Sequence, residues 1–393
     1  MLPMLQELHL ANNLMNGSIP KSLCNFKSLG LLNLSNNMFS GSIPNCWGND
    51  QSFNFIDLSS NNLSGLFPST MEQLSSLFVL HLNNNNLHGK LHVALKNFTS
   101  LMVLDLGENK FYGNLTSIVR GEIGNHSLKI LRLRKNLVSS YIPLELCCLS
   151  QLQILDLADN NLTGRIPPCF GKFPVMVNAT QLINNMNENY WSWGHLMEVV
   201  KGRYFEYTRK TLGLESSIDL SSNNLIGSIP EELIFLQDLH NLNLSCNHLS
   251  GKIPEKIGQM ENLESLDFSQ NDLSGTIPSS MSSLTKLRHL NLSYNNLSGP
   301  IPTSYQFQTL ENPTIYMGNP QLCGVPLLKK CSNDVPPSPT NNFKDNNEGA
   351  VKRMWIYIIV MLGFATALNW ILVVMTFKVA RFKKMFNGNL GDQ

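Results

Sequence analysis

Cysteines and a short run of charges are the residues in this sequence most able to do chemistry. Eight cysteines are spread over 393 residues, and Lys129, Arg132, Arg134 and Lys135 lie close together in the first half of the chain. The CxxC and HExxH patterns, which hold metal ions or support redox chemistry, do not occur in it. We therefore expect no metal, no cofactor and no enzymatic activity, and the cysteines become candidates for disulfides.

Two pairs of cysteines share one spacing. Cys24 and Cys46 are 22 residues apart, as are Cys147 and Cys169, and both pairs occupy the same positions after a Pro. Adjacent strands of a sheet lie about 4.8 Å apart, and a disulfide joins Cα atoms about 4.4 to 6.8 Å apart. We predict the bridges Cys24–Cys46 and Cys147–Cys169. The alternative is that these cysteines are buried free thiols in a reducing compartment.

The run of charges interrupts a regular pattern. The sequence contains eleven repeats, which are described below. In eight of them the residue between two core leucines is Asp or Asn, whereas in one repeat this residue is Arg132. Opposite charges occur in the adjacent repeats. The full set could bind an acidic or peptide ligand, or it could be a solvated face of salt bridges, and the sequence leaves both open. The set comprises Lys129, Arg132, Arg134, Lys135, Glu108 and Asp159.

A repeat of 24 residues positions these side chains. The segments LANNLMNGSIP (10–20), LSNNMFSGSIP (34–44) and LSSNNLSGLFP (58–68) align with Leu, Asn, Gly and Pro in fixed phase, and eleven turns follow this template. In LxxLxL, alternation places two Leu on one face of a short strand, so stacked turns form a parallel sheet over a continuous core. The Asn three residues later can bond backbone groups of neighbouring turns. We predict a leucine-rich-repeat solenoid with a parallel β-sheet on the concave face, an irregular or 3-10 convex face, and one transmembrane α-helix.

The order of segments resembles a known family. The form LHNLNLSCNHLSGKIPEKIGQMENL (239–263) resembles the plant extracellular subtype of these repeats. Repeats fill residues 1–167, an aromatic-rich insert without the template fills 168–214, four repeats fill 215–305, and a cap fills 306–333. This order is similar to plant receptor-like proteins that lack a kinase, most of all to the class that perceives an ethylene-inducing xylanase. In the cap we predict a third bridge, between Cys323 and Cys331.

The resemblance implies a role for the insert. In such receptors the insert and the last four repeats are expected to meet a ligand and the ectodomain of a co-receptor kinase. Aromatic and charged anchors of the kind that dominate interfaces are present in it. They could instead pack the insert onto the solenoid. The candidates are Tyr190, Trp191, Trp193, Lys201, Arg203, Glu206 and Tyr207.

A membrane span is predicted near the C-terminus. Residues 354–377 carry no formal charge, and a bilayer crossing needs about 20 apolar residues. A juxtamembrane linker, 334–353, precedes the span, and a tail, 378–393, follows it. The tail is too short for a kinase, so a signal would have to pass through a partner protein.

The predicted span offers a surface for that partner. Gly363 and Ala367 form a small-xxx-small pair and Asn369 supplies an amide, and both features promote helix association in membranes. One hypothesis is that this face binds an adaptor receptor kinase, and the alternative is that these small residues occur in the span by chance.

Glycosylation sequons and cysteines indicate which side faces outward. Eleven Asn-x-Ser/Thr sequons all precede the predicted span, and the cysteine spacing favours an oxidising environment. We expect a single-pass type I protein of the plasma membrane, with extracellular repeats and a cytoplasmic C-terminus. The sequons are Asn16, Asn33, Asn62, Asn97, Asn114, Asn125, Asn161, Asn178, Asn243, Asn291 and Asn296.

The expected function is recognition rather than catalysis. With 29 basic and 28 acidic residues, the chain lacks the charge of a nucleic-acid binder. We expect a cell-surface receptor for an extracellular peptide, protein or glycan of pathogen or developmental origin, signalling through co-receptor and adaptor receptor kinases in plant defence. Two alternatives are an inhibitor-type repeat protein and a non-functional truncated receptor fragment. The second arises because Met1 falls inside a repeat with no signal peptide before it.

Overall fold

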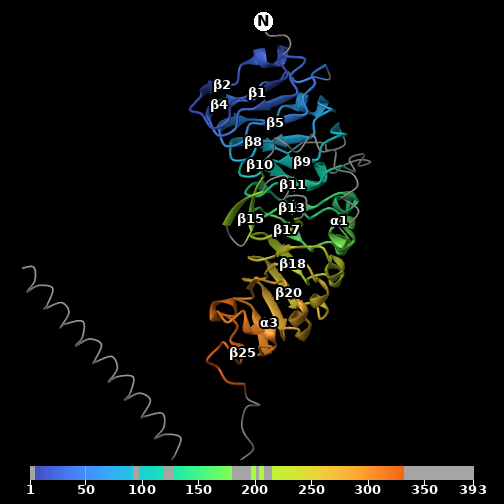
Figure 1. Cartoon of the computed structure of the whole chain (residues 1–393), viewed down its shortest axis with the longest axis vertical. Helices are drawn as coiled ribbons and strands as arrows, with labels where there is room; N and C mark the ends of the chain where they lie inside the picture. The colour runs from blue at the N-terminus through green and yellow to red at the C-terminus, as the bar shows by residue number, and fades with distance from the viewer. Residues whose placement is uncertain are drawn as a thin grey trace, which may run out of the picture. The chain divides into compact units, whose positions relative to one another are not determined.

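Short parallel strands, one from the LxxLxL segment of each turn, form the concave sheet (Figure 1). This computed structural model describes residues 5–48, 50–91, 97–118, 127–178, 196–200, 203–207 and 215–331. The sheet has 11 strands, and their order in the sheet is their order in the chain. They are β1 (Glu7–His9), β3 (Leu31–Asn33), β5 (Phe55–Asp57), β7 (Val79–His81), β9 (Val103–Asp105), β11 (Ile130–Arg132), β13 (Ile154–Asp156), β17 (Ser217–Asp219), β19 (Asn241–Asn243), β21 (Ser265–Asp267) and β23 (His289–Asn291).

The core is a stack of leucines contributed by successive turns. The central residue of each strand and the residue after the strand point inward, as Ile56 and Leu58 do, both with no exposed surface. One turn alone presents too little apolar surface to form a core, whereas stacked turns bury these side chains against one another. The predicted leucine-rich-repeat solenoid with a parallel concave sheet is therefore confirmed.

Two further parallel sheets line the lateral flank of the coil. One consists of β2 (Asn16–Ser18), β4 (Met38–Ser42), β6 (Asn62–Gly65), β8 (Asn86–Lys90), β10 (Lys110–Gly113) and β12 (Leu137–Val138). The other consists of β14 (Thr163–Gly164), β18 (Asn224–Gly227), β20 (His248–Lys252), β22 (Asp272–Gly275), β24 (Asn296–Pro300) and β25 (Gln321–Cys323).

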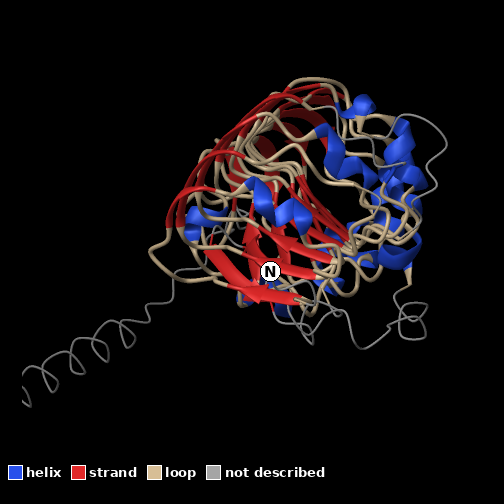
Figure 2. Ribbon diagram, turned by 90° about the horizontal axis from the view of Figure 1, so that it is seen from above, coloured by secondary structure: helices blue, strands red, loops and turns tan. Residues whose placement is uncertain are grey.

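Short helices close the convex side. Figure 2 shows strands along one arc of the coil and most of the helical turns on the opposite side. Most 3-10 turns begin directly after the Pro of the template, because Pro supplies the extended residue that precedes them. They are η1 (Lys21–Asn25), η2 (Ser69–Gln73), η4 (Leu115–Ser117), η5 (Leu144–Cys148), η6 (Pro168–Lys172), η9 (Glu231–Phe235), η10 (Ile257–Gln259), η11 (Ser279–Ser283) and η12 (Pro313–Ile315), with the α-helical turns α1 (Pro174–Val177) and α3 (Tyr305–Gln308).

The template asparagines form a continuous hydrogen-bonded ladder, which we call the asparagine ladder. In a typical rung, Asn247 Nδ2 donates to the carbonyls of Leu220, Leu244 and Ser245 at 3.0 to 3.2 Å. Asn247 Oδ1 accepts from the backbone N of Leu225 at 3.0 Å. The side chain thus satisfies backbone groups that the bend leaves unpaired, as the sequence predicts. The ladder comprises Asn13, Asn37, Asn61, Asn85, Asn109, Asn136, Asn160, Asn223, Asn247, Asn271 and Asn295.

A side chain from the preceding turn packs over the template glycine at two positions. Gly164 has φ +81°, and a Cβ on it would lie 2.2 Å from a ring carbon of Tyr141 in the turn before. Gly89 receives Leu66 in the same way, with 2.4 Å to its Cδ2. The positive φ at these positions favours glycine, and an exposed side chain of the turn before packs over its Cα.

The insert does not interrupt the solenoid. β13 pairs directly with β17, aligning Asp156 with Asp219, and Asn223 Nδ2 donates to the carbonyl of Leu157 at 3.0 Å across the gap. The first part of the predicted insert, 168–178, takes the place of an ordinary convex segment, since it contains η6 and α1 and η6 packs against η9. Within 179–214, the structure describes only an antiparallel pair, β15 (Leu196–Val200) and β16 (Arg203–Tyr207).

Three disulfides tie neighbouring segments together. Cys24–Cys46 and Cys147–Cys169 both have Cα atoms 5.9 Å apart, and Cys323–Cys331 has them 5.1 Å apart. These are the three pairs that the repeat spacing and the cap predict. Cys148 and Cys246 are free cysteines.

The cap continues the ladder for one more rung. Asn319 Nδ2 donates to the carbonyls of Leu292 and Tyr316, and its Oδ1 accepts from the backbone N of Leu297 at 2.9 Å. Tyr316 is fully buried where a template Leu would lie. The cap thus covers the open end of the leucine core with a degenerate turn.

Across the described ranges, no helix has the length and apolar character of a membrane span. The predicted span, 354–377, with its linker and tail, lies outside those ranges.

Candidate functional site

The concave sheet presents two columns of outward-facing side chains. Side chains alternate along a strand, so the first and third residues of each three-residue strand point away from the core. The parallel register aligns Leu31 with Phe55 and Phe55 with Val79 in the first column. In the second column it aligns Asp57 with His81. Each column therefore runs from turn to turn without a break.

The first column changes character at the insert. In six successive turns before the insert it is apolar, and these residues form one buried cluster with Phe78 and Met102 against it. After the insert the same column is polar. The template leaves this position unspecified, so the change was not predictable from the repeat. The apolar residues are Leu31, Phe55, Val79, Val103, Ile130 and Ile154, and the polar ones are Ser217, Asn241, Ser265 and His289.

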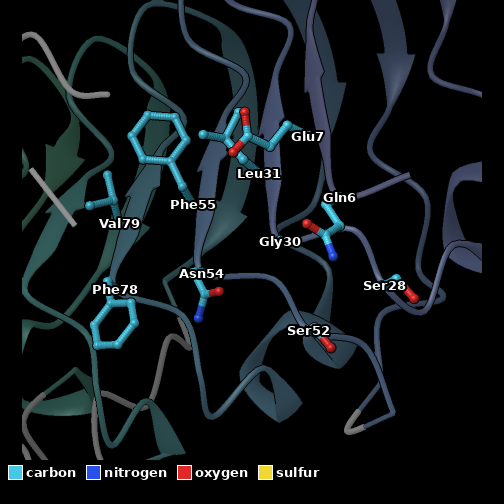
Figure 3. Close-up of a pocket in the computed structure, with 10 residues that line it drawn as sticks. All are labelled: Gln6, Glu7, Ser28, Gly30, Leu31, Ser52, Asn54, Phe55, Phe78 and Val79. Atoms are coloured by element: carbon cyan, nitrogen blue, oxygen red, sulfur yellow. The ribbon is translucent and has the colours of Figure 1, made fainter. Parts of the chain in front are cut away.

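A groove of about 310 Å³ lies over the early part of the apolar column. Figure 3 shows Leu31, Phe55 and Val79 across adjacent strands, with Asn54 and Phe78 beside them. Asn54 Nδ2 donates to the carbonyl of Ser76 at 3.0 Å, which holds the amide in place. A ligand that lies in this groove, at the N-terminal ends of the strands, would therefore contact both an aromatic ring and a polar amide.

Arg132 lies at the centre of a buried ion network in the second column. Its Nη1 is 3.0 Å from Asp105 Oδ2 and its Nε is 3.3 Å from Asp156 Oδ2, while Arg134 Nη1 is 3.2 Å from the same Asp156 oxygen. Arg132 and Arg134 are only 3% and 7% exposed. For these two arginines the salt-bridge pairing is present, but it is buried rather than solvated. Buried charges of this kind must be paired, which is why Arg132 replaces the usual acid between two acids.

Burial and neighbouring charges also shift the pKa values of His81 and of two acids in the second column. His81 Nδ1 is 3.8 Å from Asp57 Oδ2. Burial opposes both charges, but the attraction between the two outweighs it, so the pKa of His81 is raised and that of Asp57 is lowered. Burial, together with the negative charge of Asp156, raises the pKa of Asp219 to about 7.

The remaining predicted charges do not join this network as one strip. Lys135 Nζ lies 3.8 Å from Glu108 Oε2, and both residues sit at the outer bend with φ of 49° and 53°. Asp159 occupies the same bend position in the next turn and is exposed. Lys129 is buried, and burial lowers the pKa of its amine. The structure therefore separates the six candidates into the buried network, the outer bend and Lys129.

The acids of the second column also have a local structural role. Asp219 Oδ1 accepts from the backbone N and the hydroxyl of Ser221 at 3.0 and 2.6 Å, and Asp57 binds Ser59 in the same way. This bonding stabilises the exit from the strand, as Asp does in turns. It explains why Asp or Asn recurs at this position without requiring a ligand.

The insert candidates are only partly described. Arg203, Glu206 and Tyr207 belong to β16, where their Cα atoms pair with those of Val200, Met197 and Leu196. Tyr190, Trp191, Trp193 and Lys201 lie outside the described residues, as do the helix-association candidates Gly363, Ala367 and Asn369.

Comparison with known proteins shows what the chain is similar to. The family profile described as leucine rich repeat matches residues 237–297, and a second profile of that name matches 4–26, 28–49, 52–74, 151–173 and 216–236. The Arabidopsis thaliana protein "Receptor like protein 21" is 47% identical over 243 residues, covering 58% of this chain and 25% of that protein. "Receptor-like protein EIX2" of Solanum lycopersicum is 38% identical over 116 residues, covering 30% of this chain and 10% of that protein. The chain carries leucine-rich repeats and is similar to plant leucine-rich-repeat receptor-like proteins.

Solved structures of plant receptors share the fold of this chain. The Arabidopsis receptor kinase HAESA, in complex with the peptide hormone IDA and the co-receptor SERK1, gives a TM-score of 0.63 at 28% identity, covering 82% of this chain and 50% of that one. The peptide hormone receptor RGFR1 in complex with RGF2 gives 0.62 at 30% identity, covering 79% and 42%. The chain thus spans a quarter or less of these two curated relatives and half or less of these two receptors.

Proposed function

We propose that this receptor-like protein recognises an extracellular peptide along its concave face and signals through partner receptor kinases. The main support for the proposal is that the first column is apolar before the insert and polar after it. A ligand that lies along the columns would therefore bind in one orientation only. An apolar portion would lie over the turns before the insert and a polar end over the turns after it. The complexes of HAESA and RGFR1 with peptide hormones support a peptide as the ligand.

The groove beside the apolar column is the proposed entry point for the ligand. Phe78 and Asn54 are each partly exposed there, so they can gain contacts without disrupting the core. Arg132 is already paired with Asp105 and Asp156, so it fixes the shape of the sheet rather than serving as an open cation. A ligand that displaced these carboxylates would leave them buried without a partner.

Relay through a partner rests on the sequence of the predicted span, 354–377. The small residues Gly363 and Ala367 favour helix association in a membrane. We infer that the Gly363, Ala367 and Asn369 face associates with an adaptor kinase, and that the insert and last four turns meet a co-receptor. The resemblance to the xylanase-perceiving class favours plant defence as the process, with the repeats outside the cell.

Ligand capture tests the recognition half. The full chain is displayed on plant cells, exposed to a mixture of secreted peptides and crosslinked, and bound peptides are identified by mass spectrometry. Asn54→Arg with Phe78→Arg is expected to lose those peptides, whereas Gln73→Arg, an exposed convex substitution in η2, keeps them. Equal capture by both variants contradicts recognition at the concave face.

Co-precipitation tests the relay half. Replacing Gly363 and Ala367 by Leu closes the small-residue surface and is expected to reduce recovery of adaptor kinases several-fold. A matched pair of substitutions one position along, Phe364→Leu and Leu368→Ile, leaves that surface intact. Unchanged recovery after the first pair of substitutions contradicts helix association as the relay.

A further inference from the structure

A groove on the lateral flank has exposed apolar residues and no role in the concave site. It has a volume of about 760 Å³ and crosses from the turn of Lys21 to that of Tyr112. Tyr112 in β10 is 51% exposed and Leu66 is 64% exposed, and both line it. Glu72 and Lys90 line it as well, so apolar and charged side chains alternate around the groove.

A glycosylation sequon lies at the Tyr112 end of this groove. Asn114-Leu115-Thr116 begins two residues after Tyr112. Phe111 and Leu115 are each 1% exposed, whereas Tyr112 and Asn114 are exposed, so those two side chains both face solvent on the flank. Asn114 Oδ1 accepts from the backbone N of Thr116 at 2.9 Å. Among the described residues, no hydrogen bond uses Asn114 Nδ2, the atom to which a glycan is attached.

We propose that Asn114 carries an N-linked glycan whose first sugar rings pack on Tyr112 and continue into the groove toward Leu66. The C–H face of an N-acetylglucosamine ring is apolar and matches an aromatic ring, while its hydroxyls can bond to Lys90 and Glu72 at the rim. The glycan would thus cover the apolar residues that the flank exposes. The inference rests on the proposed function in one respect, passage of the chain through the secretory pathway.

Other sequons lack this combination. Asn97 Nδ2 already donates to Glu72 Oε2 at 2.7 Å. Asn291 in the concave sheet donates to an acid of the preceding turn at 3.2 Å. Asn296 also follows an exposed Tyr by two residues, but the ring of that residue, Tyr294, packs over Gly318, with 2.6 Å from its Cδ1 to a Cβ placed there. Tyr294 and Asn296 therefore provide a matched internal control.

Site occupancy is the first test. The full chain is produced in cultured plant cells behind an added, cleavable secretion signal and extracted in detergent, and intact glycopeptides are analysed by mass spectrometry. We expect a glycan on Asn114. Occupied sequons elsewhere with Asn114 bare would overturn the inference. The added signal directs the chain into the secretory pathway, so this result does not depend on where the natural protein resides. Protease protection of the natural chain measures that location separately.

Amide hydrogen exchange of residues 110–116 is the second test. The glycan on Asn114 is expected to slow exchange by about threefold to tenfold, the range that one aromatic contact supports. Enzymatic removal of the glycan from the folded protein, or Tyr112→Ala, should abolish this slowing. Tyr294→Ala should leave any effect of a glycan on Asn296 unchanged. Equal slowing with and without the Tyr112 ring would show that the sugar does not pack on it and would overturn the proposal.

Discussion

Replacing one rung of the asparagine ladder should open the solenoid locally. Asn247→Ala removes the acceptor of the Leu225 amide and three donations to carbonyls. Those carbonyls retain other donors, since Leu220 O also accepts from Asn223 and Leu244 O from Asn271. The largest single loss is therefore the buried amide left unpaired, which costs about 1 to 3 kcal/mol.

The three weakened carbonyl contacts add a smaller amount. Taken together they contribute about 1 to 2 kcal/mol, so the total destabilisation is about 2 to 5 kcal/mol. Asn13 is the matched control, because it is exposed and its amide makes two local donations, to Leu10 O and Ala11 O. Asn13→Ala should cost less than about 1 kcal/mol, since water replaces those bonds.

Hydrogen exchange followed by mass spectrometry reads the effect at the Leu225 amide itself. A loss of about 2 to 5 kcal/mol corresponds to exchange faster by roughly thirtyfold to several thousandfold if local opening precedes exchange. The measurement uses the full chain, with peptides covering residues 220–230. If exchange at Leu225 changes less than threefold in Asn247→Ala, or changes equally in Asn13→Ala, the ladder does not stabilise the fold as argued.

Three further predictions concern the ion network, a disulfide and pH. Arg132→Leu leaves the buried Asp105 carboxylate without its cation and Asp156 with Arg134 alone, and should lower the free energy of unfolding in urea by about 3 to 5 kcal/mol. Replacing Cys147 and Cys169 together by Ser should cost about 3 kcal/mol, whereas replacing the free, exposed Cys148 should cost nothing measurable. Asp219 has a pKa of about 7 in the folded chain, against an ordinary value of 3.8, so the folded state holds a proton that the unfolded state has lost between these pH values. The free energy of unfolding should therefore fall by up to about 4 kcal/mol as pH rises from 4 to 7. Asp219→Asn should flatten this pH dependence. Because that variant creates an Asn-Leu-Ser sequon, the two proteins are compared after deglycosylation. An unchanged slope in the variant would assign the pH dependence to another group.

The strands, the ladder and the two disulfides within the repeats were predictable because each recurs at a fixed phase. Leu58 and Asn61 recur every 24 residues with few exceptions, and a buried polar residue at that spacing has only neighbouring backbone groups to bond. The two cysteine pairs use the same phase. Period and burial together therefore determine these contacts, and both can be read from the order of the residues.

The left-handed residue that precedes each ladder position was not predictable from residue type. It is Lys135 in one turn, Gln270 in another and Tyr294 in a third, all with φ between 49° and 55°. A side chain other than Gly is strained in this region by about 1 kcal/mol or more. The Asn that follows compensates through its four bonds, so the residue ahead of it can vary and carries no sequence signal.

Which of the charged candidates are buried could also not be predicted from the sequence. Arg132 and Lys135 are three residues apart in one turn, yet the first is buried between two acids and the second lies at the outer bend beside Glu108. The period tells which residues face inward in the strand, but not how closely the outward columns pack. That packing depends on side chains brought together from three turns.

Continuity of the backbone across the insert makes the fold independent of the insert. The register from Ile154 to Ser217 and the bond from Asn223 to the Leu157 carbonyl are the same as between any adjacent turns, although the sequence separation is far larger. A loop of any length can leave and re-enter at this point, because loop closure costs only about 0.6 kcal/mol per doubling of length. The scaffold therefore does not depend on the insert for its register. Under the proposed function, substitutions within the insert would alter what is bound at the boundary between apolar and polar halves of the concave face, while the ladder on either side keeps that boundary fixed.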